Sequence, residues 1–168
     1  MLTTRRATLA DLPTILDLVR RVVPLMRATG NLQWSDDYPN AEVFTRDITH
    51  QQLWVAELDG AVAGVAALTQ DQDAEYAQAD WDTTVPALVT HRLAVDPAAQ
   101  GRGVALALMA EAEKQAVAQG LRMLRVDTNS ENAATQRLFP KLGYRFAGEI
   151  TLAFRPGLRF FCYEKQLG

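Results

Sequence analysis

The sequence is poor in the residues that build covalent cross-links and metal sites. Among its 168 residues there is one cysteine, Cys162, and there are two histidines, His50 and His91. A single cysteine cannot form an internal disulfide, and the usual structural zinc sites need four cysteine and histidine ligands. We therefore expect neither an internal disulfide nor a bound metal.

The chain also lacks a long apolar run. Its longest run lies near residues 61–68, and a membrane helix needs roughly 20 apolar residues. The N-terminal residues lead into a polar stretch, without the apolar segment that is typical of a secretory signal peptide. These absences predict a cytoplasmic protein that does not enter a membrane.

A strong excess of positive charge is missing as well. The formal net charge is −3, which gives no electrostatic reason to expect nucleic acid as a partner. The charge is unevenly spread, because eight acidic residues and no lysine or arginine fall between Asp47 and His91, with 17 bases against 12 acids elsewhere. This segment is either a solvated acidic loop or the part of the chain that binds a cationic partner.

What is present is the composition of a globular protein. Hydrophobic residues make up 48% of the chain and charged residues 22%, which excludes disordered and fibrous classes. The length corresponds to one domain by the usual size of domain cores. We expect residues 1–168 to form a single domain.

The order of apolar patterns and turn residues predicts an α/β fold. Asp59 and Gly60 join two strand-like runs and predict an antiparallel hairpin. Pro24 is expected to break or kink the first helix, which starts near Thr8. Helices are expected over residues 8–28, 41–49, 104–119 and 132–142, and strands over 52–58, 61–69, 87–95, 121–128, 144–153 and 158–167. The sum is a mixed sheet with helices on both faces.

The most informative segment is a glycine-bearing loop between a strand and a helix, over residues 100–105. Glycines let backbone approach a ligand closely, and the free N–H groups at the start of a helix bind phosphate oxygens. Two known phosphate motifs do not match, because Leu106 stands where a dinucleotide fingerprint needs its third glycine and no lysine precedes Lys114 for a Walker A loop. The glycines alone are also compatible with a simple tight turn.

The spacing of Gln100, Gly103 and Ala105 resembles the pyrophosphate loop of the GNAT superfamily of acyl-CoA-dependent N-acyltransferases. The resemblance continues in residues 92–97, which are similar to the family's fourth strand, and in residues 132–144, which are similar to its Asn-containing helix. It implies a mostly antiparallel sheet that splays between the fourth and fifth strands. It also implies direct transfer of an acetyl group from acetyl-CoA to an amine in a ternary complex.

The resemblance further implies a set of residues that bind acetyl-CoA along the fourth strand, the loop and the later helix. These are Leu93, Ala94, Val95, Gln100, Gly101, Arg102, Gly103, Val104, Ala105, Asn132 and Phe139. A CoA-binding sensor or docking module without turnover, and an acetyltransferase that acts on a protein amine, are the alternatives.

An attacking amine must lose a proton, so the site needs a base or a positioned water. His91 is the best-placed titratable residue, although a histidine on an apolar strand is more often a packed core residue. Glu57, Glu75 and Asp80 are weaker alternatives.

The proton donor to the departing thiolate is less clear than the base. Phe139 stands where the family often has a tyrosine, which leaves Tyr144 or solvent to protonate the thiolate. A buried, inert Cys162 is favoured over a covalent nucleophile.

The acceptor side is expected to be acidic and aromatic, and therefore to select a cationic small-molecule amine. The residues expected there are Trp34, Asp36, Tyr38, Asp80 and Trp81, with Asp37 and Asp82 nearby. Core packing and surface solubility are the alternative roles for each of them, and a homodimer stays open.

Overall fold

The computed structural model describes residues 1–168 and contains seven strands and four α-helices. The strands are β1 (Leu2–Arg6), β2 (Leu53–Leu58), β3 (Ala61–Thr69), β4 (Leu88–Val95), β5 (Met123–Asn129), β6 (Arg145–Ile150) and β7 (Phe160–Gln166). The helices are α1 (Leu12–Ala28), α2 (Ala41–Thr49), α3 (Val104–Ala118) and α4 (Ala133–Lys141), with short 3-10 turns η1 (Leu9–Asp11), η2 (Ala74–Gln78) and η3 (Pro97–Ala99). No helix is long and apolar enough to cross a membrane.

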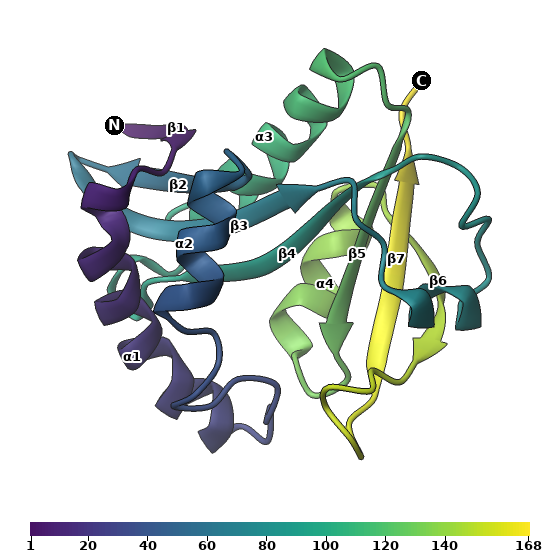
Figure 1. Ribbon diagram of the computed structural model, residues 1–168, viewed down its shortest axis with the longest axis horizontal. Coiled ribbons are helices and arrows are strands. Elements are labelled where there is room, and N and C mark those ends of the chain that lie inside the picture. The colour runs from purple at the N-terminus through teal and green to yellow at the C-terminus, as the bar shows by residue number, and fades with distance from the viewer.

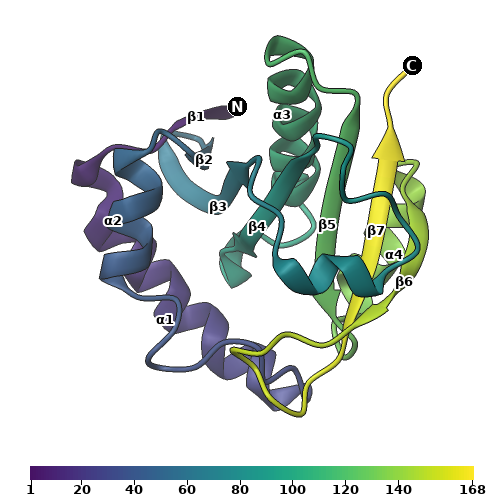
Figure 2. The ribbon, with the colours of Figure 1, turned by 45° about the vertical axis from the view of Figure 1, so that its right-hand side comes forward.

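The strands form one sheet in the order β1-β2-β3-β4-β5-β7-β6. Neighbouring strands are antiparallel except for β4 and β5, which are parallel. Helices α1 and α2 cover one face, and α3 and α4 cover the other (Figures 1 and 2). The predicted α/β fold with helices on both faces is therefore confirmed.

Each face buries its own apolar cluster. On the α1 and α2 side, Ile15, Leu18 and Phe44 are completely buried against the sheet. On the α3 and α4 side, Leu108 and Phe139 are almost completely buried. Side chains of this size stabilise the fold by about 1.5–3 kcal/mol each when fully buried. These buried apolar residues therefore hold the helices against the two faces of the sheet.

Several local predictions are confirmed. Asp59 and Gly60 connect β2 and β3, and Leu58 pairs with Ala61 across the turn. Both turn residues have the positive φ angles that such a hairpin requires. Helix α2 has the predicted bounds, and the side chain of Asn40 caps it by accepting a hydrogen bond from the Val43 amide.

The N-terminal region adds a strand that was not predicted and excludes the predicted break of the first helix at Pro24. Residues 2–6 form an edge strand whose backbone pairs with β2, from Leu2 opposite Leu58 to Arg6 opposite Trp54. The sequence of this strand does not reveal it, because the strand is held by backbone pairing with β2 and its residues show no alternation of apolar and polar side chains. Helix α1 also continues through Pro24 to Ala28. The missing N–H costs one hydrogen bond, while the apolar stripe of α1 on either side stays buried against the sheet.

The two final strands are shorter than predicted, and the last strand, β7, lies between β5 and β6. The acidic segment between β3 and β4 crosses the outside of this half of the sheet, and its short turn η2 contacts β6. Tyr76 of η2 is completely buried in a third apolar cluster with Val89, Ile150 and Phe160. The acidic segment is thus a packed part of the fold.

Candidate functional site

The site is built where two parallel strands separate. Pairing between β4 and β5 consists of Leu88 with Leu124, Val89 with Arg125, and Thr90 with Val126. Both strands continue beyond these pairs, β4 to Val95 and β5 to Asn129, without pairing to each other. The strands therefore diverge after Thr90 and Val126 (Figure 1), which confirms the predicted splay. His91 and Asp127 are the first residues beyond the last pair.

A cavity occupies this divergence. Its walls come from β4, β5, α4, the end of α1 and the loop after it, the segment before η2 and the loop between β6 and β7. The lining residues include Gln33, Trp34, Tyr38, Asp73, Thr90, His91, Arg92, Leu93, Val126, Asp127, Thr128, Asn132, Thr135, Phe139, Leu152 and Phe154. The structure thus brings six of the predicted residues together around one opening, namely Trp34, Tyr38, His91, Leu93, Asn132 and Phe139.

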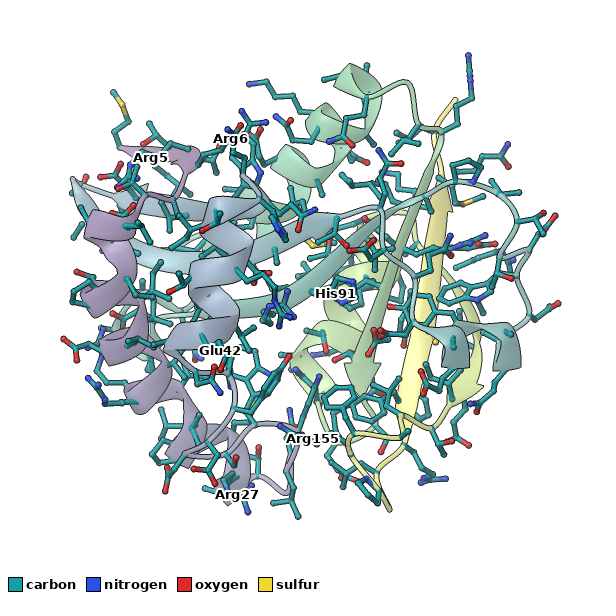
Figure 3. All side chains as sticks on the ribbon, in the orientation of Figure 1. Arg5, Arg6, Arg27, Glu42, His91 and Arg155 are labelled. Atoms are coloured by element: carbon teal, nitrogen blue, oxygen red, sulfur yellow. The ribbon has the colours of Figure 1, made fainter.

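His91 lies at the centre of the molecule, in the region where the two halves of the sheet diverge (Figure 3). Its Nε2 atom is 3.4 Å from the carbonyl oxygen of Asp71. Side-chain ligand atoms of Asp73, His91 and Asp127 all lie within 4.8 Å of one another. An imidazole beside two carboxylates in the lining of an open cavity can bind a cationic group and can accept a proton from it.

Asp127 was not among the residues predicted from the sequence. The Tyr76 hydroxyl donates a hydrogen bond of 2.5 Å to its Oδ1. Burial raises the pKa of Asp127 above its usual range, and it raises the pKa of Tyr76 as well, so the phenol stays a proton donor at neutral pH. The register of β4 with β5 identifies Asp127 as the neighbour of His91, and that register is not visible in the sequence.

Arg92 stands beside His91 at an irregularity of the sheet. Val65 pairs with Ala94 and Ala67 pairs with His91, so Ala66 faces two residues of β4, Arg92 and Leu93. Arg92 has a φ of +53°, which is strained for a residue other than glycine and is typical of functional sites.

Two partners fix the Arg92 side chain. Its Nε and Nη2 atoms donate to both carboxylate oxygens of Asp47 at 2.7 and 2.8 Å, and Nη1 donates to the Tyr38 hydroxyl at 3.3 Å. The Arg92 side chain is 17% exposed, and the residue lines the cavity. Arg92 therefore holds α2, through Asp47, and the loop before α2, through Tyr38, against β4.

The loop of residues 100–105 follows the C-terminal end of β4, which is Val95. Gly101 and Gly103 have φ angles of +76° and +84°, in the region that favours glycine. The amide groups of Gly101, Arg102 and Gly103 have no hydrogen-bond partner in the protein. Helix α3 begins at Val104, and no side chain caps its N-terminus.

These features fit a phosphate group at the loop. A Cβ atom at Gly101 would have no neighbour within 4 Å, so its outer side is open to a ligand. The β3 backbone packs tightly beneath the helix start, because a Cβ on Gly64 would lie 2.5 Å from Cγ1 of Val104. The loop thus presents free N–H groups on a rigid support, as anion binding requires.

The remaining acceptor residues predicted from the sequence do not join the cavity. Asp36 is exposed and lines a separate hollow between α1 and the start of α2. Asp80 is exposed, and its backbone accepts a hydrogen bond from Arg145. Trp81 packs over Arg125, with the guanidinium carbon 4.9 Å from the ring centroid. The structure provides no shared site for these three residues.

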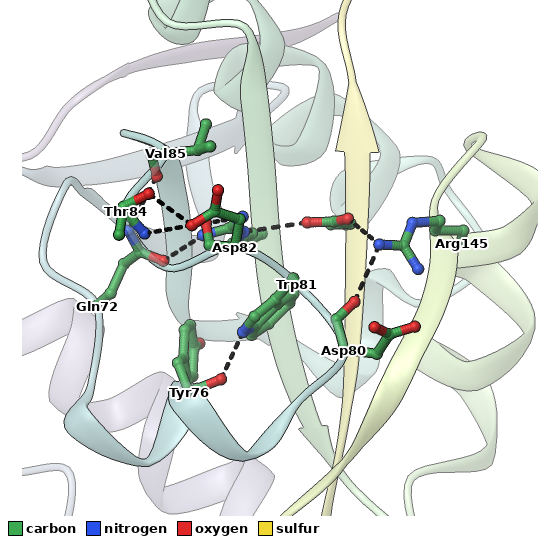
Figure 4. A network of polar contacts seen from close by, with 10 residues as sticks. Gln72, Tyr76, Asp80, Trp81, Asp82, Thr84, Val85 and Arg145 are labelled. Atoms are coloured by element: carbon green, nitrogen blue, oxygen red, sulfur yellow. Dashed lines mark hydrogen bonds and ion pairs between the residues drawn. The ribbon is translucent and has the colours of Figure 1, made fainter.

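A network of polar contacts holds the acidic segment in place (Figure 4), and Arg125 lies at its centre, with contacts to Glu164, Gln72 and Asp82. The Arg125 side chain is 1% exposed, and its guanidinium donates to Glu164 at 3.1 Å, to Gln72 at 2.5 Å and to the backbone oxygen of Asp82 at 2.8 Å. Trp81 donates from its indole nitrogen to the backbone oxygen of Tyr76. Arg125 therefore holds the segment that carries Asp73 and Tyr76 against β5.

Three other predicted residues have clear local surroundings. Cys162 is completely buried in the apolar cluster with Tyr76, and burial raises the pKa of its thiol well above the usual range. A buried thiol of this kind is a poor nucleophile. Phe139 packs against Tyr144 and Tyr163. The Asn132 side chain caps α4 by accepting from the Thr135 amide at 3.2 Å.

Comparison with known proteins gives one family. The model of the Acetyltransferase (GNAT) family matches residues 19–144. Human (Homo sapiens) N-acetylaspartate synthetase is 30% identical over 113 residues, which make up 67% of this chain and 34% of that protein. The zebrafish (Danio rerio) N-acetylaspartate synthetase is 28% identical over 122 residues. The chain spans between a third and two fifths of the length of these curated relatives.

Solved structures share the architecture. A GNAT family acetyltransferase from Streptococcus agalactiae superposes with a TM-score of 0.81 and 27% identity, covering 99% of this chain and 96% of that one. The structure of yncA from Salmonella typhimurium with its cofactor acetyl-CoA has a TM-score of 0.73 and covers 100% of this chain and 95% of that one. At 21% identity the second match shows the fold alone.

Proposed function

Because the chain belongs to the acetyltransferase (GNAT) family, we propose that it transfers an acetyl group from acetyl-CoA to a primary amine. The observation that supports this proposal is the divergence of β4 and β5, where a cavity with titratable groups lies beside the strand that leads to the uncapped start of α3. Donor and acceptor sites then meet at β4.

The loop and β4 fit the two parts of the donor. The free amides of Gly101, Arg102 and Gly103, with those at the start of α3, would hold the pyrophosphate. Residues 93–95 of β4 would run beside the extended arm, with Asn132 and Phe139 on the opposite wall. Acetyl-CoA supplies a thioester whose carbonyl carbon accepts the amine nitrogen. Backbone N–H groups near the irregular stretch of β4 would polarise that carbonyl.

His91 is the proposed base. It lies in the cavity wall, beside two carboxylates that attract a protonated amine. An alkylamine with a pKa near 10 arrives mostly protonated, so the site must remove one proton before the nitrogen can attack. The imidazole can accept this proton directly or through one water molecule.

The proposed acceptor is a cationic small-molecule amine. Asp73 and Asp127 supply negative charge in the lining of the cavity, while the Trp34 and Tyr38 rings form an aromatic wall. Because Asp47 neutralises the Arg92 guanidinium in the same wall, the excess charge is negative, and such charge raises the local concentration of a cationic substrate. This support comes from residues other than the exposed Asp36 and Asp80.

An amino acid acceptor is the second candidate. Arg92 lines the same cavity and offers a guanidinium to a carboxylate, although Asp47 already neutralises it. The curated relatives are named N-acetylaspartate synthetases. An acceptor with both an amine and a carboxylate would bridge His91 and Arg92.

The test is release of free thiol from acetyl-CoA with matched amines. The panel contains a diamine, the neutral-tailed monoamine of the same chain length, and amino acids with neutral and acidic side chains. The proposal expects the highest kcat/KM for the diamine. Highest activity with aspartate would favour the second candidate, and acetyl-CoA binding without thiol release from any amine would identify a binding module.

A further inference from the structure

The carboxylate of Asp127 has no permanent positive partner. No arginine or lysine forms an ion pair with it. Its one side-chain partner is the hydroxyl of Tyr76, which is itself completely buried. A carboxylate removed from water is unfavourable unless hydrogen bonds and a positive charge compensate for the lost hydration.

The groups around Asp127 leave one source of positive charge. Four titratable side chains face it from the elements packed against β5, namely Asp73 before η2, Tyr76 on η2, His91 on β4 and Cys162 on β7. Asp73 adds negative charge, and the phenol and the thiol are neutral when protonated. The His91 imidazole is therefore the one group in this set that can become a cation.

We propose that Asp127 is a positioning residue for His91. The Asp127 carboxylate orients the imidazole, and it stabilises the imidazolium that forms when His91 takes a proton from the acceptor amine. The inference rests on the proposed function for its catalytic role. Tyr76 contributes by holding Oδ1, which fixes the carboxylate beside the opening. Arg125 contributes by fastening the segment that carries Tyr76.

The proton balance is complete with these groups. One N–H proton of the ammonium passes to His91 and later to solvent. The nitrogen lone pair forms the new C–N bond, the C–S bond breaks, and its electron pair stays on sulfur. The second N–H proton ends on that sulfur. Asp127 keeps its charge throughout, so the imidazolium forms beside a fixed negative group.

The test measures the titration midpoints of His91 and His50 by NMR, with no substrate present. His50 is exposed in the turn after α2 and serves as the internal reference. Asp127→Asn keeps the shape of the side chain and removes its charge, while Asp127→Glu keeps the charge. Asp17→Asn is the matched control, because it removes an exposed carboxylate on α1 that pairs with Arg20.

In Asp127→Asn we expect the His91 titration midpoint to fall by about one pH unit, a tenfold weaker proton affinity. The His50 midpoint should stay in place, and Asp17→Asn should move neither. With the best acceptor, Asp127→Asn should lower kcat roughly tenfold or more, leave KM for acetyl-CoA unchanged and move the acidic limb of the kcat pH profile. Asp127→Glu should restore the midpoint in part.

An unchanged His91 midpoint in folded Asp127→Asn would overturn the inference, whatever the activity. If that variant does not fold, Asp127→Ser removes the same charge with a smaller side chain and is read in the same way. Absence of thiol release by the wild-type protein would refute the proposed function, while the NMR titration would still decide the role of Asp127.

Discussion

Gly103 offers a sharp test of the anion-binding loop. Its φ of +84° favours glycine, and an added Cβ would meet protein only at 3.8 Å, on Leu2. Gly103→Val should therefore destabilise the fold by conformational strain, about 1–2 kcal/mol, and not by a steric clash. For a chain of this size the melting temperature should fall by about 2–8 °C.

Gly120 supplies a matched control at the far end of α3. Its φ is +72°, and an added Cβ would have no neighbour within 4 Å. Gly120→Val should produce a similar loss of stability. At Gly103, the side chain should also separate backbone N–H groups from a phosphate. Losing one such charge-assisted hydrogen bond costs about 1.5–3 kcal/mol, which corresponds to roughly 10- to 100-fold in affinity.

Isothermal titration calorimetry with acetyl-CoA distinguishes the two effects. Gly103→Val should bind acetyl-CoA roughly 10- to 100-fold more weakly, and Gly120→Val should keep the wild-type Kd. Equal Kd values for wild type and folded Gly103→Val would refute the assignment of the loop. Equal losses in both variants would show that strain, not contact with the ligand, changes the affinity.

Three further predictions address the base, the cysteine and acid stability. His91→Gln and His91→Ala should lower kcat by roughly 10²- to 10⁴-fold with unchanged acetyl-CoA affinity; a wild-type pH profile at near-full rate in both would place the base elsewhere. Cys162→Ala should keep kcat within about twofold, since the thiol is buried and protonated, and a large loss in the folded variant would contradict direct transfer. The Arg5 guanidinium lowers the pKa of Asp11 to about 2 from its ordinary 3.8. This pair should contribute at most about 2 kcal/mol above pH ~4 and lose it as the pH falls towards 2. Urea unfolding of wild type and Asp11→Asn at pH 7 and pH 2.5 checks this, and a stability gap that does not shrink at low pH would contradict it.

Local chemistry explains which parts of the fold were predictable. The hairpin at Asp59 and Gly60 follows from residues that adopt positive φ angles, and the start of α2 follows from the cap at Asn40. The spacing of Gln100 and Gly103 identified the family, because a strand, loop and helix adjacent in sequence form that motif. These features depend on neighbours within a few residues.

The features that the sequence did not reveal depend on distant contacts. Asp127 becomes the neighbour of His91 only through the register of β4 with β5. The strand at residues 2–6 is visible only through its pairing with β2. The sequence left the acidic segment as either a solvated loop or a surface for a cationic partner, and it did not reveal that the buried guanidinium of Arg125 binds the backbone of this segment at Asp82. Such pairings involve residues that are tens of positions apart.

Single-turnover acetyl transfer tests the proposed direct reaction most directly. The protein, in excess over acetyl-CoA, is mixed with the best acceptor, and the reaction is quenched at successive times. Mass spectrometry then measures the acetyl group on the amine and on the protein. We predict that the acetyl group moves from CoA to the amine and never appears on the protein. An acetyl group that stays on CoA throughout, despite saturated binding, or one that accumulates on Cys162, would contradict direct transfer to an amine at the opening between β4 and β5.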